Sequence, residues 1–174
     1  MHNGGYASSE ELIYEDDGHY HLRVSAFYEF DSYANDIIDF IFDTGAFLTV
    51  ISRVTAQEFG FLDRYTIQSD ISLAGFSGEC LADLKEIPGM VVGGRRLTGV
   101  KVAVPHLITD MDILGLNVID HFKFFIDTEK DRIYFSENPK PEIPEMLKAK
   151  DIQVISPGGS EQCGKMGVGG KKVH

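Results

Sequence analysis

The chain has 174 residues, a length that suits one domain with tails and is sufficient to bury a core. Its 27 acidic residues outnumber its 16 basic residues, and the formal net charge of −11 excludes electrostatic attraction to nucleic acid or to an anionic membrane, so we expect neither partner. The two cysteines, Cys80 and Cys163, form no disulfide framework and favour a reducing compartment. We therefore expect a soluble cytoplasmic protein, and the same pattern fits a soluble fragment of a longer one.

Composition divides the chain into three parts. Residues 1–18 are polar and acidic and predict an N-terminal segment or edge arm. Residues 19–138 form the body, in which short apolar runs alternate with glycine turns, a pattern typical of a mainly β fold such as a small closed barrel or a sandwich. Residues 139–174 are rich in proline and then glycine, and they predict a largely disordered tail.

The body begins with a predicted hairpin. His19–Phe30 alternates between two faces with a period of two, which predicts a half-buried strand. Residues 31–36 have the composition of a turn, and Ile37–Phe42 is a second apolar strand. The hairpin therefore delivers Asp43 to a bend.

A third strand, a short helix and three further hairpins are predicted after this bend. Phe47–Ile51 is apolar, Ser52 or Thr55 is placed to cap a helix, and Gly60 lies where that helix would stop. A second short helix is expected directly after Gly115. The predicted hairpins pair Ile67–Ala74 with Glu79–Ile87, Met90–Val92 with Leu97–Val104, and Phe122–Asp127 with Arg132–Phe135.

The bend at Asp43 is the feature that carries chemistry. Asp43 is followed by Thr44, Gly45 and Ala46, and this polar tetrad interrupts two apolar strands. Burial of an unpaired carboxylate is costly, so an acid at this place needs a partner or a chemical role. Gly45 supplies a tight bend, and the hydroxyl of Thr44 can lock it with a hydrogen bond.

This order of motifs resembles the retropepsin-like aspartic proteases, the single-lobe relatives of pepsin, over about Tyr20 to Phe135. The resemblance implies a small closed β-barrel of the acid-protease type with one or two short helices. Leu116 stands where viral members usually carry a basic residue, so the match is closer to the bacterial branch. The resemblance makes Asp43 the catalytic residue. It implies support from Thr44, Gly45, Ala46, Ile113, Leu114 and Gly115, and a flap over the substrate made of Ala74, Gly75, Phe76, Ser77 and Gly78.

The chemistry of amide hydrolysis predicts that the chain works as a homodimer. Two carboxylates that share one proton can both activate a water and protonate the leaving group, and one carboxylate cannot. Asp43 begins the only Asp-[Thr/Ser]-Gly in the sequence. We therefore expect a two-fold dimer that brings two copies of Asp43 together on a peptide substrate, without any metal or other cofactor.

Three alternatives remain open at this point. The chain is a non-catalytic peptide-binding or dimerisation module on the same fold, or Asp43 is an ordinary turn acid. A more distant alternative is a metal-dependent hydrolase that uses His19 and His21, which we interpret as exposed strand histidines. Asp112 and Asp120 flank Gly115 and could mimic a catalytic pair, but we interpret them as a solvated turn acid and a helix acid.

Overall fold

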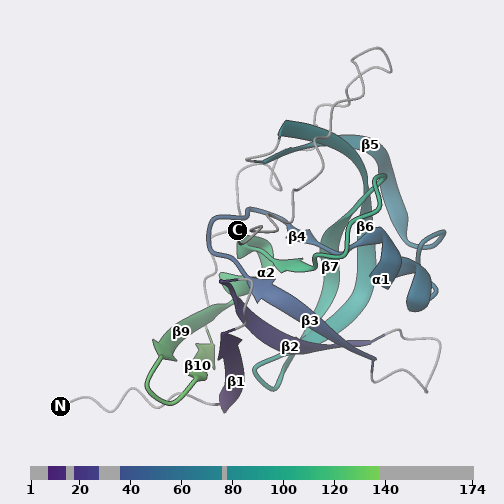
Figure 1. Cartoon of the computed structure of the whole chain (residues 1–174). Helices are drawn as coiled ribbons and strands as arrows, with labels where there is room; N and C mark the ends of the chain where they lie inside the picture. The colour runs from purple at the N-terminus through teal and green to yellow at the C-terminus, as the bar shows by residue number, and fades with distance from the viewer. Residues whose placement is uncertain (1–7, 15–17, 28–35, 76–77, 138–174) are drawn as a thin grey trace, which may run out of the picture.

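The computed structural model describes residues 8–14, 18–27, 36–75 and 78–137 of the chain, which form a mainly β structure with two short helices (Figure 1). The mainly β prediction is therefore confirmed. Residues 31–35 of the predicted turn, the end of the first predicted strand at residues 28–30 and the predicted tail lie outside the described residues, and Asp36, the last residue of the predicted turn, begins β3. The elements are β1 (Ser8–Tyr14), β2 (Tyr20–Phe27), β3 (Asp36–Phe42), β4 (Thr49–Val50), α1 (Arg53–Glu58), β5 (Thr66–Gly75), β6 (Gly78–Val92), β7 (Arg95–Pro105), β8 (Ile113–Leu114), α2 (Leu116–Ile119), β9 (Phe122–Asp127) and β10 (Arg132–Glu137).

The strands pair in the order β5-β6-β7-β4-β8-β3-β2-β1-β10-β9. β1 lies between β2 and β10, with which it forms antiparallel pairs. β2 also pairs with β6 over three residues, at Ser25 to Phe27. Closure into a complete barrel is not confirmed by this short pairing and stays a prediction.

The main core lies between the strands that carry the site. In β3, which the sequence predicts as an apolar strand, the side chains of Ile38 and Phe40 are buried, whereas those of Ile37 and Asp39 are exposed. Buried residues from other strands and from both helices join this cluster, among them Leu22, Ile87, Met90, Val102, Val118 and Phe135. A second, smaller cluster contains Leu48, Ile71, Ala82, Leu84 and Ala103.

Two strands differ in length from those predicted. The third strand is only Thr49–Val50, because the carbonyls of Ala46 and Phe47 accept hydrogen bonds from the first amides of α2 instead of joining a strand ladder. Conversely, Gly78–Val92 is one continuous strand. The sequence divides it at Pro88, which lacks an N–H to donate to the ladder.

α1 is held by a side-chain cap. Ser52 is its N-cap, and its hydroxyl accepts a hydrogen bond from the Thr55 amide at 3.0 Å. This settles the choice between the two predicted caps. Gly60 follows the helix with a φ of +71°, a conformation that favours glycine after a helix end. Neither helix of the described residues has the length and hydrophobicity that crossing a membrane requires.

Lys85 of β6 is fully buried, a feature that the sequence pattern does not predict. Its ammonium donates to the carbonyl oxygens of Leu62 and Arg64 at 2.6 and 3.1 Å and to the Thr66 hydroxyl at 2.6 Å. Burial lowers the pKa of Lys85, although Asp83 and Asp63 act in the opposite direction. The three acceptors match the three N–H donors of an ammonium, so Lys85 holds the loop that leads into β5 in place by hydrogen bonds.

Candidate active site

Asp43 lies directly after β3 and is half-buried. Its backbone amide donates to the carbonyl oxygen of Leu114 at 3.2 Å. Its carboxylate accepts a hydrogen bond from the Gly45 amide at 2.7 Å. A Cβ at Gly45 would lie 3.1 Å from the same carboxylate oxygen, so a side chain there would crowd the bond that orients Asp43.

β8 brings the second motif beside the first. It runs parallel to β3, where Ile113 faces Ile41 and Leu114 faces Phe42, and antiparallel to β4. The bend at Asp43 and the bend at Gly115 therefore follow the ends of two neighbouring parallel strands, β3 and β8. The sequence separates these motifs by about seventy residues, and the fold places them side by side.

Gly115 is buried against the chain that follows the Asp43 bend. A Cβ at this position would lie 2.6 Å from the carbonyl carbon of Leu48, 2.7 Å from its oxygen and 2.8 Å from the amide nitrogen of Thr49. These are backbone atoms, so no side-chain rotation can relieve the contact. The close approach of two backbones is the reason for glycine at this position.

Thr49 and Asn117 form a polar link behind the bend, which the sequence motifs did not predict. The buried Thr49 hydroxyl accepts from the Gly115 amide at 3.1 Å and donates to the Asn117 side-chain oxygen at 2.9 Å. The same oxygen accepts from the Thr49 amide at 2.7 Å, and the Asn117 side-chain amide donates to the Lys101 carbonyl at 2.8 Å. The sequence signals for this link were a threonine within an apolar strand and an asparagine within an apolar helix.

Asp112 is a structural acceptor, so its interpretation as a solvated turn acid is wrong. Its two carboxylate oxygens accept from the Ser52 amide and the Thr55 hydroxyl, each at 2.7 Å. Burial raises the pKa of Asp112, while the hydrogen bonds from Ser52 and Thr55 lower it and nearby Asp39 raises it. Asp120, by contrast, is the C-cap of α2, as its interpretation as a helix acid predicts. The two acids therefore occupy separate structural positions.

The predicted flap is the tip of the β5–β6 hairpin. Ala74 pairs with Glu79 and Gly75 pairs with Gly78, whose φ of +116° requires glycine. Phe76 and Ser77 lie outside the described residues.

Nearer the base of this hairpin, His106, directly after β7, lies close to an acid of β5 and an acid of β6. Its Nε2 lies 3.0 Å from Oδ1 of Asp83, and its Nδ1 lies 3.7 Å from Oδ1 of Asp70.

The predicted strand histidines have different environments. His19 is exposed, whereas His21 is half-buried and its Nδ1 lies 3.6 Å from Oδ1 of Asp39. Across the described ranges, no group of three or more His, Cys, Asp or Glu side chains is placed to hold a metal ion.

Comparisons with known proteins agree with this arrangement. The family model described as "Aspartyl protease" matches residues 34–118, which include Asp43, the β5–β6 hairpin and Gly115. The crystal structure of a retropepsin-like aspartic protease from Rickettsia conorii is 25% identical with a TM-score of 0.56, and the match covers 74% of this chain and 98% of that chain. The sequence match is thus to an aspartyl protease family model, and the fold is similar to that of a retropepsin-like protease, which agrees with the resemblance seen in the sequence.

Two further comparisons complete the findings. The structure of EIAV protease complexed with the inhibitor HBY-793 is 15% identical with a TM-score of 0.45, over 62% of this chain and 90% of that chain. No curated protein matches the sequence.

Proposed function

We propose that the chain is an aspartic endopeptidase that hydrolyses peptide bonds with two copies of Asp43, one from each subunit of a homodimer. The observation that carries the proposal is the bend itself: Asp43 is held by Leu114 and Gly45 at the end of β3, within the segment that matches the aspartyl protease family. One carboxylate would take a proton from the attacking water, while the other would act as an acid toward the substrate carbonyl.

The surroundings of Asp43 favour a second copy as the source of the other acid. Thr44 and Gly45 are exposed beside the half-buried Asp43, so this surface is open to a partner. Asp112 precedes Gly115 by three residues and is the acid nearest before it in the sequence. Its carboxylate already accepts two hydrogen bonds at the start of α1. A second Asp43, related by a two-fold axis, would complete the dyad.

The remaining predicted residues receive roles that follow from their positions. Thr44, Gly45 and Ala46 would line the dyad, and Ile113, Leu114 and Gly115 would support the bend from the neighbouring strand. The flap from Ala74 to Gly78, on the β5–β6 hairpin, would cover an extended peptide and pair with its backbone. The short β2–β6 pairing also supports the proposed closed barrel.

The first experiment compares Asp43→Asn and Asp43→Ala with the wild-type protein on a mixed peptide library, with and without pepstatin. We expect both variants to lose cleavage and pepstatin to inhibit the wild type. Asp131→Asn is the matched control, because Asp131 is an exposed turn acid whose positive φ asparagine also tolerates. Cleavage that persists in the Asp43 variants would contradict the mechanism.

A mixing experiment then tests the shared site. With a threefold excess of Asp43→Asn subunits and free exchange, activity per wild-type subunit should fall to about one quarter, since one dimer partner in four remains wild type. Activity that stays unchanged after subunit exchange would show that each chain works alone. A wild-type protein that binds peptides and cuts none would instead support the non-catalytic module.

A further inference from the structure

His106 lies directly after β7, and its ring lies between one acid of each strand of the β5–β6 hairpin. Its Nε2 lies 3.0 Å from Oδ1 of Asp83 on β6, and its Nδ1 lies 3.7 Å from Oδ1 of Asp70 on β5. Its backbone amide donates to the Leu81 carbonyl at 2.9 Å, which extends the pairing of β6 and β7 by one residue. The ring is therefore carried by a backbone that is itself bonded to the sheet.

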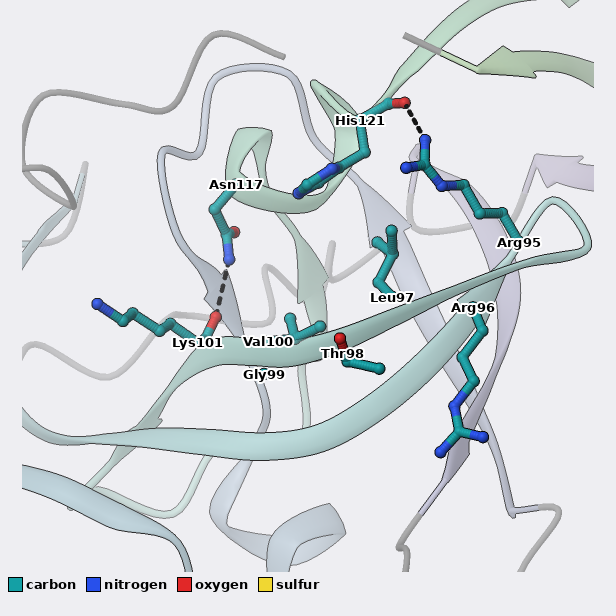
Figure 2. Close-up of a pocket in the computed structure, with 9 residues that line it drawn as sticks. All are labelled: Arg95, Arg96, Leu97, Thr98, Gly99, Val100, Lys101, Asn117 and His121. Atoms are coloured by element: carbon teal, nitrogen blue, oxygen red, sulfur yellow. Dashed lines mark hydrogen bonds between the residues drawn. The ribbon is translucent and has the colours of Figure 1, made fainter. Parts of the chain in front are cut away.

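β7 gives this ring a fixed base. The strand pairs with β6 from its first residue to its last, and with β4 near its end. Figure 2 shows two side-chain bonds that hold the same strand beside α2. Asn117 donates to the Lys101 carbonyl at 2.8 Å, and Arg95 donates to the His121 carbonyl at 3.2 Å.

β5, by contrast, is the outermost strand of the described sheet, and among the described strands it pairs with β6 alone. Its ladder is irregular between Thr66 and Ile71, and Asp70 within this stretch has a φ of +56°. Most side chains disfavour that conformation, although aspartate and asparagine tolerate it better than others. Lys85 donates to the Thr66 hydroxyl at the start of β5, and His106 faces the same strand at Asp70.

The protonation state of the ring decides whether both acids are bonded. A neutral imidazole has one N–H donor and one lone pair, whereas a protonated imidazole has two N–H donors. An ionised carboxylate only accepts, so we assign the proton of a neutral ring to Nε2, which lies 3.0 Å from Asp83. Nδ1 then turns its lone pair toward Asp70, and repulsion between two acceptors fits the longer distance of 3.7 Å. Protonation replaces this repulsion by a charge-assisted hydrogen bond to Asp70.

The charged groups around the ring come from β5 and β6. β5 contributes Asp70 and β6 contributes Asp83, while β4 (Thr49–Val50) carries no titratable side chain. Lys85 lies two residues beyond Asp83 on β6, and the charge of Asp83 raises the pKa of Lys85 against the larger effect of burial. In the loop after β7, Asp112 is bonded at the start of α1 and Asp110 is exposed.

We propose that His106 is a pH-dependent positioning residue of the proposed flap, whose protonated ring bridges Asp70 of β5 and Asp83 of β6 and holds their hairpin at the end of β7. Histidine ordinarily changes its charge between about pH 5 and 8, so this His106 bridge is complete at the acidic end of that range and is lost as pH rises. A hairpin that is already held in place binds an extended peptide at a smaller cost of ordering, so peptide binding is tighter at acidic pH. The effect on peptide binding rests on the proposed function, whereas the bridge itself does not.

Hydrogen exchange of the full wild-type chain tests the bridge without any substrate. Exchange of the β5 and β6 amides is followed by mass spectrometry at about pH 5.5 and about pH 8, on either side of the ordinary histidine range, and corrected for the intrinsic effect of pH. We expect corrected exchange to be about two- to fivefold slower at the acidic pH, as for a partly exposed charge pair. The difference should shrink in high salt.

Variants assign this difference to the ring. His106→Gln keeps a donor for Asp83 but is neutral at every pH, so it should remove the difference. Asp70→Asn retains a side chain that tolerates the positive φ and should also remove most of the difference, with the Asp83 contact in place. His19→Gln is the matched control: it removes an exposed histidine outside the hairpin and β7, and the difference should persist.

Peptide cleavage then connects the bridge to the flap. Relative to the wild type at the same pH, His106→Gln should raise KM about two- to fivefold at the acidic pH without a change in kcat, and should leave KM unchanged at the higher pH. A wild type that shows the exchange difference but cleaves no peptide would support the bridge and contradict the proposed proteolysis.

Either of two exchange results would overturn the proposal. They are equal corrected exchange of the wild type at both pH values, and a difference that persists in both His106→Gln and Asp70→Asn. An unchanged KM of His106→Gln at the acidic pH would overturn its role in positioning the flap.

Discussion

Replacing Gly115 by alanine perturbs the packing behind Asp43 most directly. The added Cβ would lie 2.6 to 2.8 Å from three backbone atoms of Leu48 and Thr49, closer than real Cβ atoms approach. Overpacking of a well-packed interior typically costs about 1–3 kcal/mol. Because backbone atoms cannot rotate away, we expect Gly115→Ala to lower the free energy of unfolding by about 3 kcal/mol, the upper end of that range.

Gly60→Ala is the matched control, because it separates strain from crowding. Gly60 has a φ of +71°, and a Cβ added there would meet no atom within 4 Å, so alanine at this position is strained but not crowded. A left-handed conformation costs a non-glycine residue about 1–2 kcal/mol. Gly115 has an ordinary φ of −101°, so its cost arises from space alone.

Urea unfolding measures both variants. The midpoint for Gly115→Ala should lie below that of Gly60→Ala, with similar slopes. Peptidase activity should also fall further in Gly115→Ala, since the neighbouring Leu114 carbonyl holds the Asp43 amide. A Gly115→Ala protein at least as stable as Gly60→Ala would refute the reasoning about close backbone contact.

Three further substitutions test buried polar groups. Lys85→Met leaves three acceptors without their donor, so we expect the free energy of unfolding, measured with urea, to fall by about 3 kcal/mol. Thr49→Val keeps the shape of the side chain but leaves the buried Gly115 amide without an acceptor, so the free energy of unfolding should fall by about 2 kcal/mol. The same substitution at the exposed Thr98 is the control and should change the free energy of unfolding very little. The raised pKa of Asp112 means that the folded chain holds its proton more tightly than the unfolded chain, so the contribution of Asp112 to stability should fall as pH rises from about 4 through the folded pKa. Asp112→Asn should remove this fall, and an identical pH slope in both proteins would contradict the assignment.

The strands were predictable where one face is buried and the other is exposed. The alternation of Ile38, Asp39 and Phe40 matches the two faces of β3, whereas Ile37 is apolar in the sequence and exposed in the structure. The predicted length of β4 is too great, because an apolar run does not reveal that its first carbonyls are taken by the amides of a distant helix. Only two residues of that run join the ladder.

The candidate site was only partly predictable, since much of it consists of contacts between distant segments. Asp43 stands out because an acid between apolar strands is unusual. The bonds of Asp112 to Ser52 and Thr55 span about sixty residues, and local sequence carries no signal for them. For this reason the local pattern predicts a solvated acid at Asp112, although in the fold its carboxylate accepts hydrogen bonds from residues at the start of α1.

The bends at Asp43 and Gly115 supply a structural reason for the proposal that each chain contributes one carboxylate to the dyad. β3 and β8 are neighbouring parallel strands, and extension of their register sets Asp43 opposite Gly115. At the first bend a carboxylate stands where the strand ends, whereas at the second bend even a Cβ would collide with Leu48. Placing an acid at Gly115 would therefore break the packing that supports Asp43. In the proposed mechanism the second carboxylate would therefore come from a second copy of the chain, and a two-fold axis through the exposed surface of Thr44 and Gly45 would bring it without any change to this packing.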